Sequence, residues 1–227
     1  MNTDIKAMIL YEDKSLIVLH KPAGMAVESA RVTQPDLVSL LRAYLRAEVY
    51  PVHRLDQVVE GAVVFAKTKS AAAQLSRQVQ DGSMRKIYRA RVCGKVPAES
   101  GTLSDELIRD KGSNLTRVVP AGTDPRAKKA VLRYRRLSDN EVEIELVTGR
   151  FHQIRAQLAH AGMPVEGDVK YGAPADTRQR GKIALVASEL TFRHPLTGRQ
   201  MTFSVGDAGV GSGKGDNGDS PFCHPER

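Results

Sequence analysis

Strand-like segments outnumber helix-like segments in this chain, and the two kinds follow one another in no regular order. Short apolar or alternating stretches are typical of strands, and apolar stripes at a spacing of three or four residues are typical of helices. The strand-like stretches occupy residues 8–11, 16–20, 62–67, 86–94, 130–137, 142–147, 183–192 and 201–205, and the helical stripes occupy residues 35–45, 70–80 and 152–161. This order excludes a regular alternation of strand and helix and predicts an α+β fold.

The composition changes near the C-terminus. The chain is long enough for one large domain or two small ones, and its apolar content of 41% is typical of an ordinary core. From Gly206 onward the sequence is rich in glycine and poor in large apolar residues. Such a segment buries too little apolar surface to offset the entropy lost on ordering. We therefore predict one folded domain at residues 1–205 and a disordered tail at residues 206–227.

The charge balance indicates a polyanionic partner. Lys and Arg number 34 against 26 Asp and Glu, which gives a net charge of +8. Charge of this sign attracts polyanions over long distances, nucleic acid first and an anionic membrane second. No apolar run approaches the roughly 18 residues that a membrane helix needs, and the N-terminus carries no secretion signal. We therefore predict a cytoplasmic protein.

Neither the cysteines nor the histidines form a metal-binding pattern. The two cysteines lie far apart in the sequence, which fits neither a disulfide framework nor a zinc spacing. The six histidines form no H-x-x-x-H or H-E-x-x-H motif. We expect no metal and no cofactor.

Three short motifs supply a carboxylate, a phenol and a guanidinium. They are H-R-L-D at residues 53–56, K-I-Y at residues 86–88 and H-Q-I-R at residues 152–155. A carboxylate can form a covalent adduct that divides one difficult reaction step into two. Asp56 is therefore either a catalytic nucleophile or an ordinary aspartate of a turn.

Arg155 lies beside the apolar stripe of a predicted helix. Ile154 and Leu158 follow the spacing of one helix face, and Arg155 is rotated by about 100° from Ile154 around the helix axis. We expect its guanidinium at the margin between core and solvent, with His152 on the same side. A half-buried arginine needs an acidic partner, either in a structural ion pair or in a pair with Asp56.

Tyr88 falls on the apolar face of its predicted strand, where a core tyrosine is the default interpretation. The alternative is a ring that stacks on a nucleic-acid base, with a hydroxyl able to relay a proton. A basic stretch follows from residue 109 to residue 136. We expect several of its cations in loops that contact phosphates.

Taken together and in order, these motifs resemble those of the pseudouridine synthases, specifically the ribosomal large subunit synthase A family. That family's signature around its catalytic aspartate, H-R-L-D-x-x-T-S-G, resembles H-R-L-D-Q-V-V-E-G at residues 53–61. The further similarities are K-P-A-G at residues 21–24, K-I-Y at 86–88, G-R-F-H-Q-I-R at 149–155, G-D at 167–168, Y-G at 171–172 and F-R-H-P at 192–195. The resemblance covers residues 9–205, nearly all of the predicted folded part.

The resemblance implies a mixed, mainly antiparallel central sheet flanked by helices and loops. It implies an isomerase that converts specific uridines of structured RNA, such as a tRNA or rRNA stem-loop, to pseudouridine. Asp56 would be the nucleophile, Arg155 its ion-pair partner, and Tyr88 the ring that stacks on the flipped base. The expected RNA-binding residues are His53, Arg54, Lys86, Arg150, His152 and Gln153. We also expect a monomer without the S4-type RNA-binding domain that many relatives carry.

Some positions depart from the family's pattern. Val59 and Glu60 stand where the family usually has Thr and Ser, Phe151 replaces a small hydroxyl residue, and Val186 falls where His is frequent. Val59 and Glu60 keep a second hypothesis open, a non-catalytic RNA-binding or RNA-folding factor on the same fold. A third hypothesis, an enzyme acting on small nucleotides, is disfavoured because the sequence has no glycine-rich phosphate loop.

Overall fold

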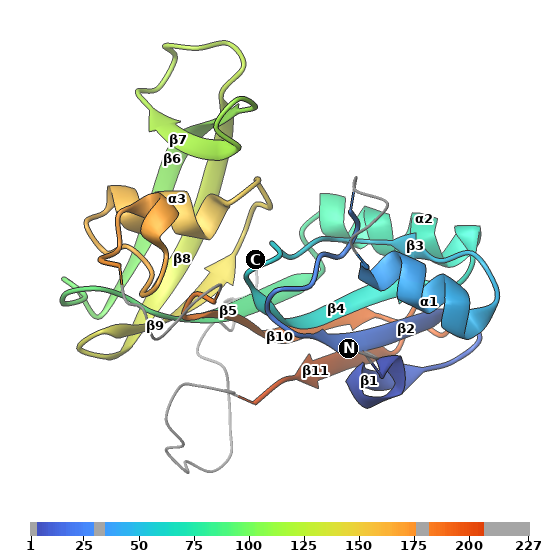
Figure 1. Cartoon of the computed structure of the whole chain (residues 1–227). Coiled ribbons are helices and arrows are strands. Elements are labelled where there is room, and N and C mark those ends of the chain that lie inside the picture. Colours follow the sequence, from blue (N-terminus) through green and yellow to red (C-terminus); the bar gives the residue numbers. More distant parts are fainter. Residues whose placement is uncertain (1–3, 30–34, 176–181, 207–227) are drawn as a thin grey trace.

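The computed structural model describes residues 4–29, 35–175 and 182–206, and its centre is a twisted sheet (Figure 1). The strands are β1 (Ile9–Glu12), β2 (Leu16–Lys21), β3 (Tyr50–Pro51), β4 (Glu60–Ala66), β5 (Arg85–Arg91), β6 (Ser100–Asp110), β7 (Leu115–Val119), β8 (Lys128–Ser138), β9 (Glu141–Leu146), β10 (Leu185–Arg193) and β11 (Gln200–Ser204). The helices are α1 (Leu37–Leu45), α2 (Lys69–Gln80) and α3 (Gln153–His160), and short 3-10 turns form η1 (Ile5–Met8) and η2 (Val169–Tyr171). The predicted tail lies outside the described residues, apart from Gly206.

The strands join in one sheet whose order is β1-β2-β4-β10-β5-β9-β8-β6-β7, with β3 beside β4 and β11 beside β10. Within the described ranges, β4 and β10 run parallel to each other, and the other strand pairs are antiparallel. The helices follow no regular alternation with the strands. The predicted α+β class and the mixed, mainly antiparallel sheet are therefore confirmed.

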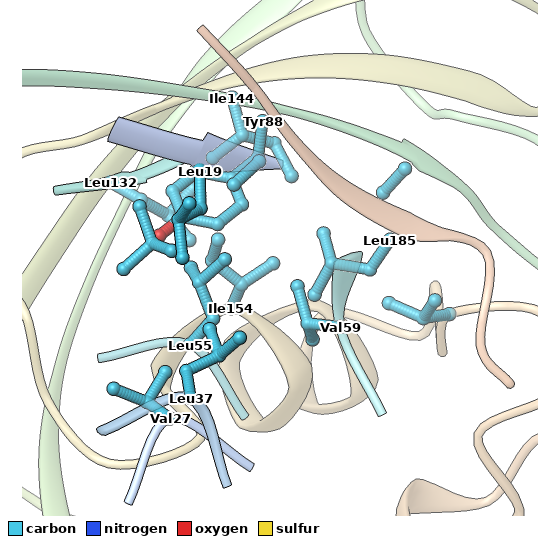
Figure 2. Close-up of a cluster of buried hydrophobic side chains, with 14 of the residues drawn as sticks. Leu19, Val27, Leu37, Leu55, Val59, Tyr88, Leu132, Ile144, Ile154 and Leu185 are labelled. Atoms are coloured by element: carbon cyan, nitrogen blue, oxygen red, sulfur yellow. The ribbon is translucent and has the colours of Figure 1, made fainter. Parts of the chain in front are cut away.

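Alternation along the central strands builds a core on each face of the sheet. Leu19 of β2 is buried on one face and Val18 on the other, because successive side chains of a strand point in opposite directions. Leu41 of α1 and Leu158 of α3 join the first core, part of which is shown in Figure 2. Leu75 of α2 joins the second core. α1 and α3 thus cover one face and α2 covers the other.

Side-chain caps fix where two of the helices begin. Asp36 Oδ1 accepts the amide hydrogen of Ser39 at the start of α1, and Thr68 Oγ1 accepts the amide hydrogen of Ala71 at the start of α2. α1 therefore begins two residues after the predicted start at residue 35. α2 and α3 agree with their predicted ranges to within one residue at each end.

The prediction of loops within the basic stretch after residue 109 was partly wrong, and contact of its cations with phosphates stays a prediction. Arg109 lies in β6 and Arg117 in β7, whereas Lys111 and Arg126 lie in turns. β6 mixes polar, glycine and apolar residues, and it is a strand because β8 pairs with one edge and β7 with the other. The β6–β7 hairpin (residues 100–119) stands out beside α3 in Figure 1.

The strand that follows Asp56 passes unusually close to β10. Gly61, at the start of β4, has φ +136°, and a Cβ added to it would lie only 2.6 Å from Ala187 Cβ. Any side chain there would meet both an unfavourable backbone conformation and a steric overlap. Gly61 therefore allows β4 and β10 to approach each other directly behind the loop that carries Asp56.

We predict that Gly61→Ala lowers the free energy of unfolding by about 3 kcal/mol or more, because backbone strain and overpacking add. Gly82→Ala is the matched control, since Gly82 has φ +79° but nothing within 4 Å of the added Cβ. That variant carries the backbone strain alone and should lose about 1–2 kcal/mol. Urea denaturation of both variants measures the difference, and equal losses would contradict the close approach of β4 to β10.

Candidate active site

Asp56 lies in the segment between β3 and β4, and the K-P-A-G turn after β2 holds that segment in place. The amide of Val59 donates to Asp56 O at 3.0 Å and closes a tight turn. The next residue, Gln57, is fixed from the other side. Its carbonyl accepts from Gly24 N at 2.7 Å and from Lys21 Nζ at 3.2 Å, and its Nε2 donates to Gly24 O at 2.9 Å.

Lys21 is fully buried behind this turn. Besides Gln57, its Nζ donates to the carbonyls of Pro22 at 3.0 Å and Met25 at 2.8 Å. Burial lowers the pKa of Lys21 to about 8, although the carboxylates of Asp56 and Glu60 oppose the shift. A buried ammonium therefore both shapes the Asp56 turn and adds positive potential beneath it.

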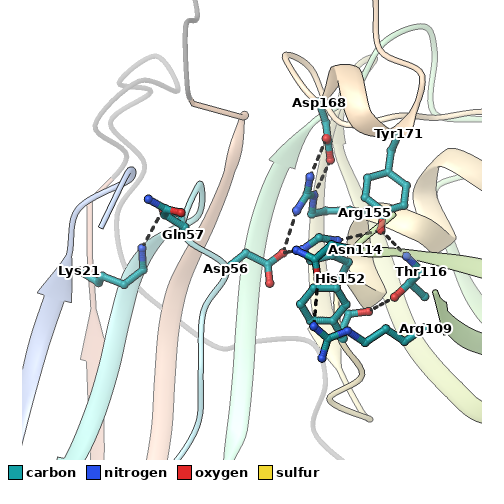
Figure 3. A network of polar contacts seen from close by, with 11 residues as sticks. Lys21, Asp56, Gln57, Arg109, Asn114, Thr116, His152, Arg155, Asp168 and Tyr171 are labelled. Atoms are coloured by element: carbon teal, nitrogen blue, oxygen red, sulfur yellow. Dashed lines mark hydrogen bonds and ion pairs between the residues drawn. The ribbon is translucent and has the colours of Figure 1, made fainter. Parts of the chain in front are cut away.

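Arg155 joins two carboxylates (Figure 3). Its Nε and NH2 donate to the two oxygens of Asp168 at 2.6 Å and 2.8 Å, and its NH1 donates to Asp56 Oδ2 at 3.2 Å. The predicted position at the core margin was wrong, since Arg155 is only 4% exposed. The bidentate pair with Asp168 satisfies the guanidinium and so permits this depth.

Asp56 keeps one carboxylate oxygen available. Oδ2 faces Arg155, whereas Oδ1 has no hydrogen-bond partner among the described residues, and the side chain is 22% exposed. Burial raises the pKa of Asp56, and the nearby cations of Arg155, Lys21 and Arg54 oppose that shift. The geometry thus offers a partly shielded oxygen that is free to bond to a substrate.

His152 approaches the same carboxylate in a defined protonation state. The Tyr171 hydroxyl accepts the Thr116 amide hydrogen at 2.9 Å and shares a second hydrogen bond with His152 Nδ1, also at 2.9 Å. The other ring nitrogen, Nε2, lies 3.6 Å from Asp56 Oδ2. Burial and the Arg155 charge lower the pKa of His152 to about 3, so the ring is neutral at physiological pH.

Tyr88 forms the apolar wall of the site. It belongs to the core cluster on the α1 and α3 side, together with Leu19, Leu132 and Ile144 (Figure 2). Burial raises the pKa of Tyr88, and the Asp56 carboxylate raises it further. The side chain is therefore a neutral phenol at physiological pH.

The residues predicted to bind RNA divide into two groups. Arg54 and Arg150 are exposed. Arg54 adds positive potential at Asp56. Arg150 Nε donates a hydrogen bond to Lys129 O at 3.0 Å. Lys86 and His53 lie deeper, and burial lowers the pKa of both, that of His53 to about 3.

Gln153 has structural contacts that the sequence reasoning did not anticipate. Its Oε1 accepts from Arg150 N at 2.9 Å and from Thr148 Oγ1 at 2.8 Å, and its Nε2 donates to Val131 O at 3.1 Å and Gln157 Oε1 at 3.0 Å. The buried amide thus ties the start of α3 to β8. A contact of Gln153 with RNA stays a prediction.

Three residues of the site were not predicted as such from the sequence. Lys21, Asp168 and Tyr171 all lie in motifs that the resemblance had marked, namely K-P-A-G, G-D and Y-G. Their spacing in the chain gave no indication that Asp168 would pair with Arg155 or Tyr171 with His152. Only the matches to these motifs could have marked the three residues as members of the site.

Val59 and Glu60, which depart from the family's pattern, lie beside the site. Neither takes the place of Asp56, Tyr88 or Arg155. Val59 is buried in the core with Leu55 and Leu185 (Figure 2). Glu60 begins β4 and pairs with Val186 of β10.

Among the described residues, no cluster of His, Cys, Asp and Glu has the arrangement of a metal site. No helix in this part of the chain is long and apolar enough to span a bilayer.

Comparison with known proteins gives a consistent result. The family model described as RNA pseudouridylate synthase matches residues 15–160. The chain is 35% identical over 201 residues to the uncharacterized RNA pseudouridine synthase YhcT of Bacillus subtilis, with 83% of this chain and 65% of that protein covered. It is 32% identical over 203 residues to the dual-specificity RNA pseudouridine synthase RluA of Escherichia coli, with 87% and 92% covered.

The fold has close counterparts among solved structures. The human RNA pseudouridylate synthase domain containing 1 superposes with a TM-score of 0.72 at 22% identity, covering 89% of this chain and 84% of that one. At this level of identity the likeness concerns the fold.

The chain spans slightly less than two thirds of the Bacillus relative's length. The family model and the relatives show that the chain belongs to the RNA pseudouridylate synthase family.

Proposed function

We propose that this protein is an RNA pseudouridine synthase that isomerises specific uridines in structured RNA, with Asp56 as the nucleophile. One observation carries the proposal: Arg155 holds one oxygen of the Asp56 carboxylate, and the other oxygen has no partner among the described residues. The match to RNA pseudouridylate synthases over residues 15–160 supports the reaction type. Residues 1–205 would form the catalytic domain.

The proposed reaction rearranges bonds without a change in oxidation state. The bond between N1 of uracil and C1′ of the ribose breaks, the uracil turns, and a bond forms between C5 and C1′. The hydrogen on C5 leaves as a proton, and N1 gains a proton. Asp56 Oδ1 would add to an electrophilic carbon of the nucleotide and leave again, which divides the exchange into easier steps.

The residues around Asp56 have distinct parts in this proposal. Arg155 keeps the carboxylate ionised and aimed, because an adjacent cation favours the charged form. His152 places its Nε2 3.6 Å from the same oxygen and adds no positive charge, since burial and Arg155 hold its pKa at about 3. Tyr88 would stack on the flipped base as a neutral phenol, because its pKa is raised.

The proposed substrate is a structured RNA, either tRNA or rRNA. Among the relatives, the Escherichia coli protein is named a dual-specificity synthase and a Neisseria meningitidis protein is named for the large ribosomal subunit. Arg54 and Arg150 are exposed cations at or near the site that could contact phosphates. Flipping a base costs a few kcal/mol, so unpaired loop uridines are favoured. The cytoplasmic location and the monomeric state stay predictions.

The function is tested by mapping pseudouridine in total RNA from cells with and without the gene. The proposal predicts that one or a few sites lose the modification when the gene is absent and regain it when the gene is restored. The sites found would also identify the RNA. An unchanged map, together with salt-dependent binding of RNA by the protein, would favour the non-catalytic RNA-binding factor.

We expect kcat/KM to fall at low pH with a midpoint above the ordinary aspartate pKa of about 3.9. Burial raises the pKa of Asp56, so the carboxylate is protonated, and no longer nucleophilic, at a higher pH than a solvated aspartate. Rates measured across pH at constant ionic strength, with RNA below KM, give the midpoint. A midpoint at or below the ordinary value would be inconsistent with Asp56 as the essential ionised group.

We expect Arg155→Lys to lower kcat by at least about tenfold, because a point charge cannot donate to Asp168 and Asp56 together as the planar guanidinium does. Arg150→Lys is the control, since Arg150 is exposed and lies outside the ion-pair network, and its kcat should change little. Single-turnover kinetics and thermal unfolding of both variants separate catalysis from folding. Equal kcat values for the two variants would overturn the role of Arg155.

A further inference from the structure

A three-layer stack connects the β6–β7 hairpin to the catalytic centre. The guanidinium carbon of Arg109 lies 3.9 Å from the centroid of the Phe151 ring. The opposite layer is His152, whose ring centroid lies 3.8 Å from that of Phe151 at an interplanar angle of 20°. His152 in turn faces Asp56, so the stack leads from an exposed cation to the catalytic carboxylate.

Hydrogen bonds connect the β6–β7 hairpin to the active-site residues beside this stack. Arg109 pairs across the ladder with Thr116, which is buried. Thr116 Oγ1 donates to Phe151 O at 2.7 Å, and the Thr116 amide donates to the Tyr171 hydroxyl at 2.9 Å. Arg109 is therefore held at the rim of the active site by its own strand and not by a mobile loop.

The Arg109 guanidinium has a free cationic charge. NH2 donates to Asn114 Oδ1 at 3.0 Å, which restrains the plane of the group (Figure 3). Among the ion pairs of the described residues none involves Arg109, and the residue is exposed. The guanidinium carbon lies over the Phe151 ring. The residue thus presents an unneutralised cation to solvent beside the proposed active site.

We propose that Arg109 is a base-stacking residue that binds an unpaired nucleobase next to the target uridine. Unpaired bases of RNA stack on arginine guanidinium planes, and the positive charge also attracts the adjacent phosphate. Phe151 is a positioning residue, because its ring contacts the guanidinium and fixes where it lies. This inference rests on the proposed function and adds a contact to RNA outside the catalytic carboxylate.

The identity of residue 151 makes the arrangement particular to this chain. Phe151 stands where the resemblance leads one to expect a small hydroxyl residue. A small side chain would leave Arg109 without a flat support and would leave one face of His152 uncovered. The aromatic ring supplies both contacts from one position.

The test compares Arg109→Lys with Arg117→Lys. The first variant keeps the charge but loses the plane, so phosphate attraction survives and stacking is lost. Arg117 is the matched control, because it is exposed on the same hairpin and pairs with Ile108, which places its side chain on the opposite face from Arg109. The substrates are total tRNA and total rRNA from cells without the gene, labelled with tritium at carbon 5 of uridine.

We expect Arg109→Lys to raise the apparent KM for the labelled RNA by about tenfold, as the loss of one stacked base implies. Its kcat and its melting temperature should stay close to those of the wild type. Phe151→Leu should raise KM similarly, and the double variant should add little, because both changes remove the same contact. Arg117→Lys should leave KM unchanged.

Other outcomes separate this inference from the proposed function. An unchanged KM for Arg109→Lys would overturn base stacking while tritium release by the wild type still supported the synthase. Equal increases for Arg109→Lys and Arg117→Lys would also overturn it, since the effect would then not depend on the face of the hairpin. No tritium release from either RNA by the wild type would refute the proposed function itself.

Discussion

The candidate active site depends on one buried guanidinium shared between two carboxylates. A buried arginine is stable only if its donors are satisfied, and Asp168 accepts from two of the nitrogens of Arg155. Because Asp168 meets most of that demand, Asp56 needs to give only Oδ2 to the pair. Without Asp168, Nε and NH2 of the buried guanidinium would lose these acceptors.

Burial then sets the protonation state of the groups around this pair. It lowers the pKa of His152 to about 3 and raises the pKa of Tyr88, so both side chains are neutral at physiological pH. Arg155 stays charged, with its pKa raised by Asp168 and Asp56 although burial opposes this. The positive charge that contacts Asp56 therefore comes from a rigid side chain whose charge does not change with physiological pH.

Sequence patterns predicted the fold class and marked candidate site residues. They did not predict how deeply those residues are buried or which residues they contact. Helical spacing indicated Arg155 beside an apolar stripe, yet its full burial follows from Asp168, 13 residues later, which no local pattern connects to it. β6 was missed because its strand conformation comes from pairing with β7 and β8 and not from its own residues. Likewise, the contact between Arg109 and Phe151 exists only after the hairpin has folded against α3.

The most direct test of the account compares the wild type with Asp56→Asn in a tritium-release assay on RNA labelled at carbon 5 of uridine. Asparagine is isosteric, and its amide oxygen can still accept from Arg155, so RNA binding should persist. The account predicts release by the wild type and almost none by the variant at equal RNA occupancy. Turnover by the variant close to that of the wild type would contradict Asp56 as the nucleophile.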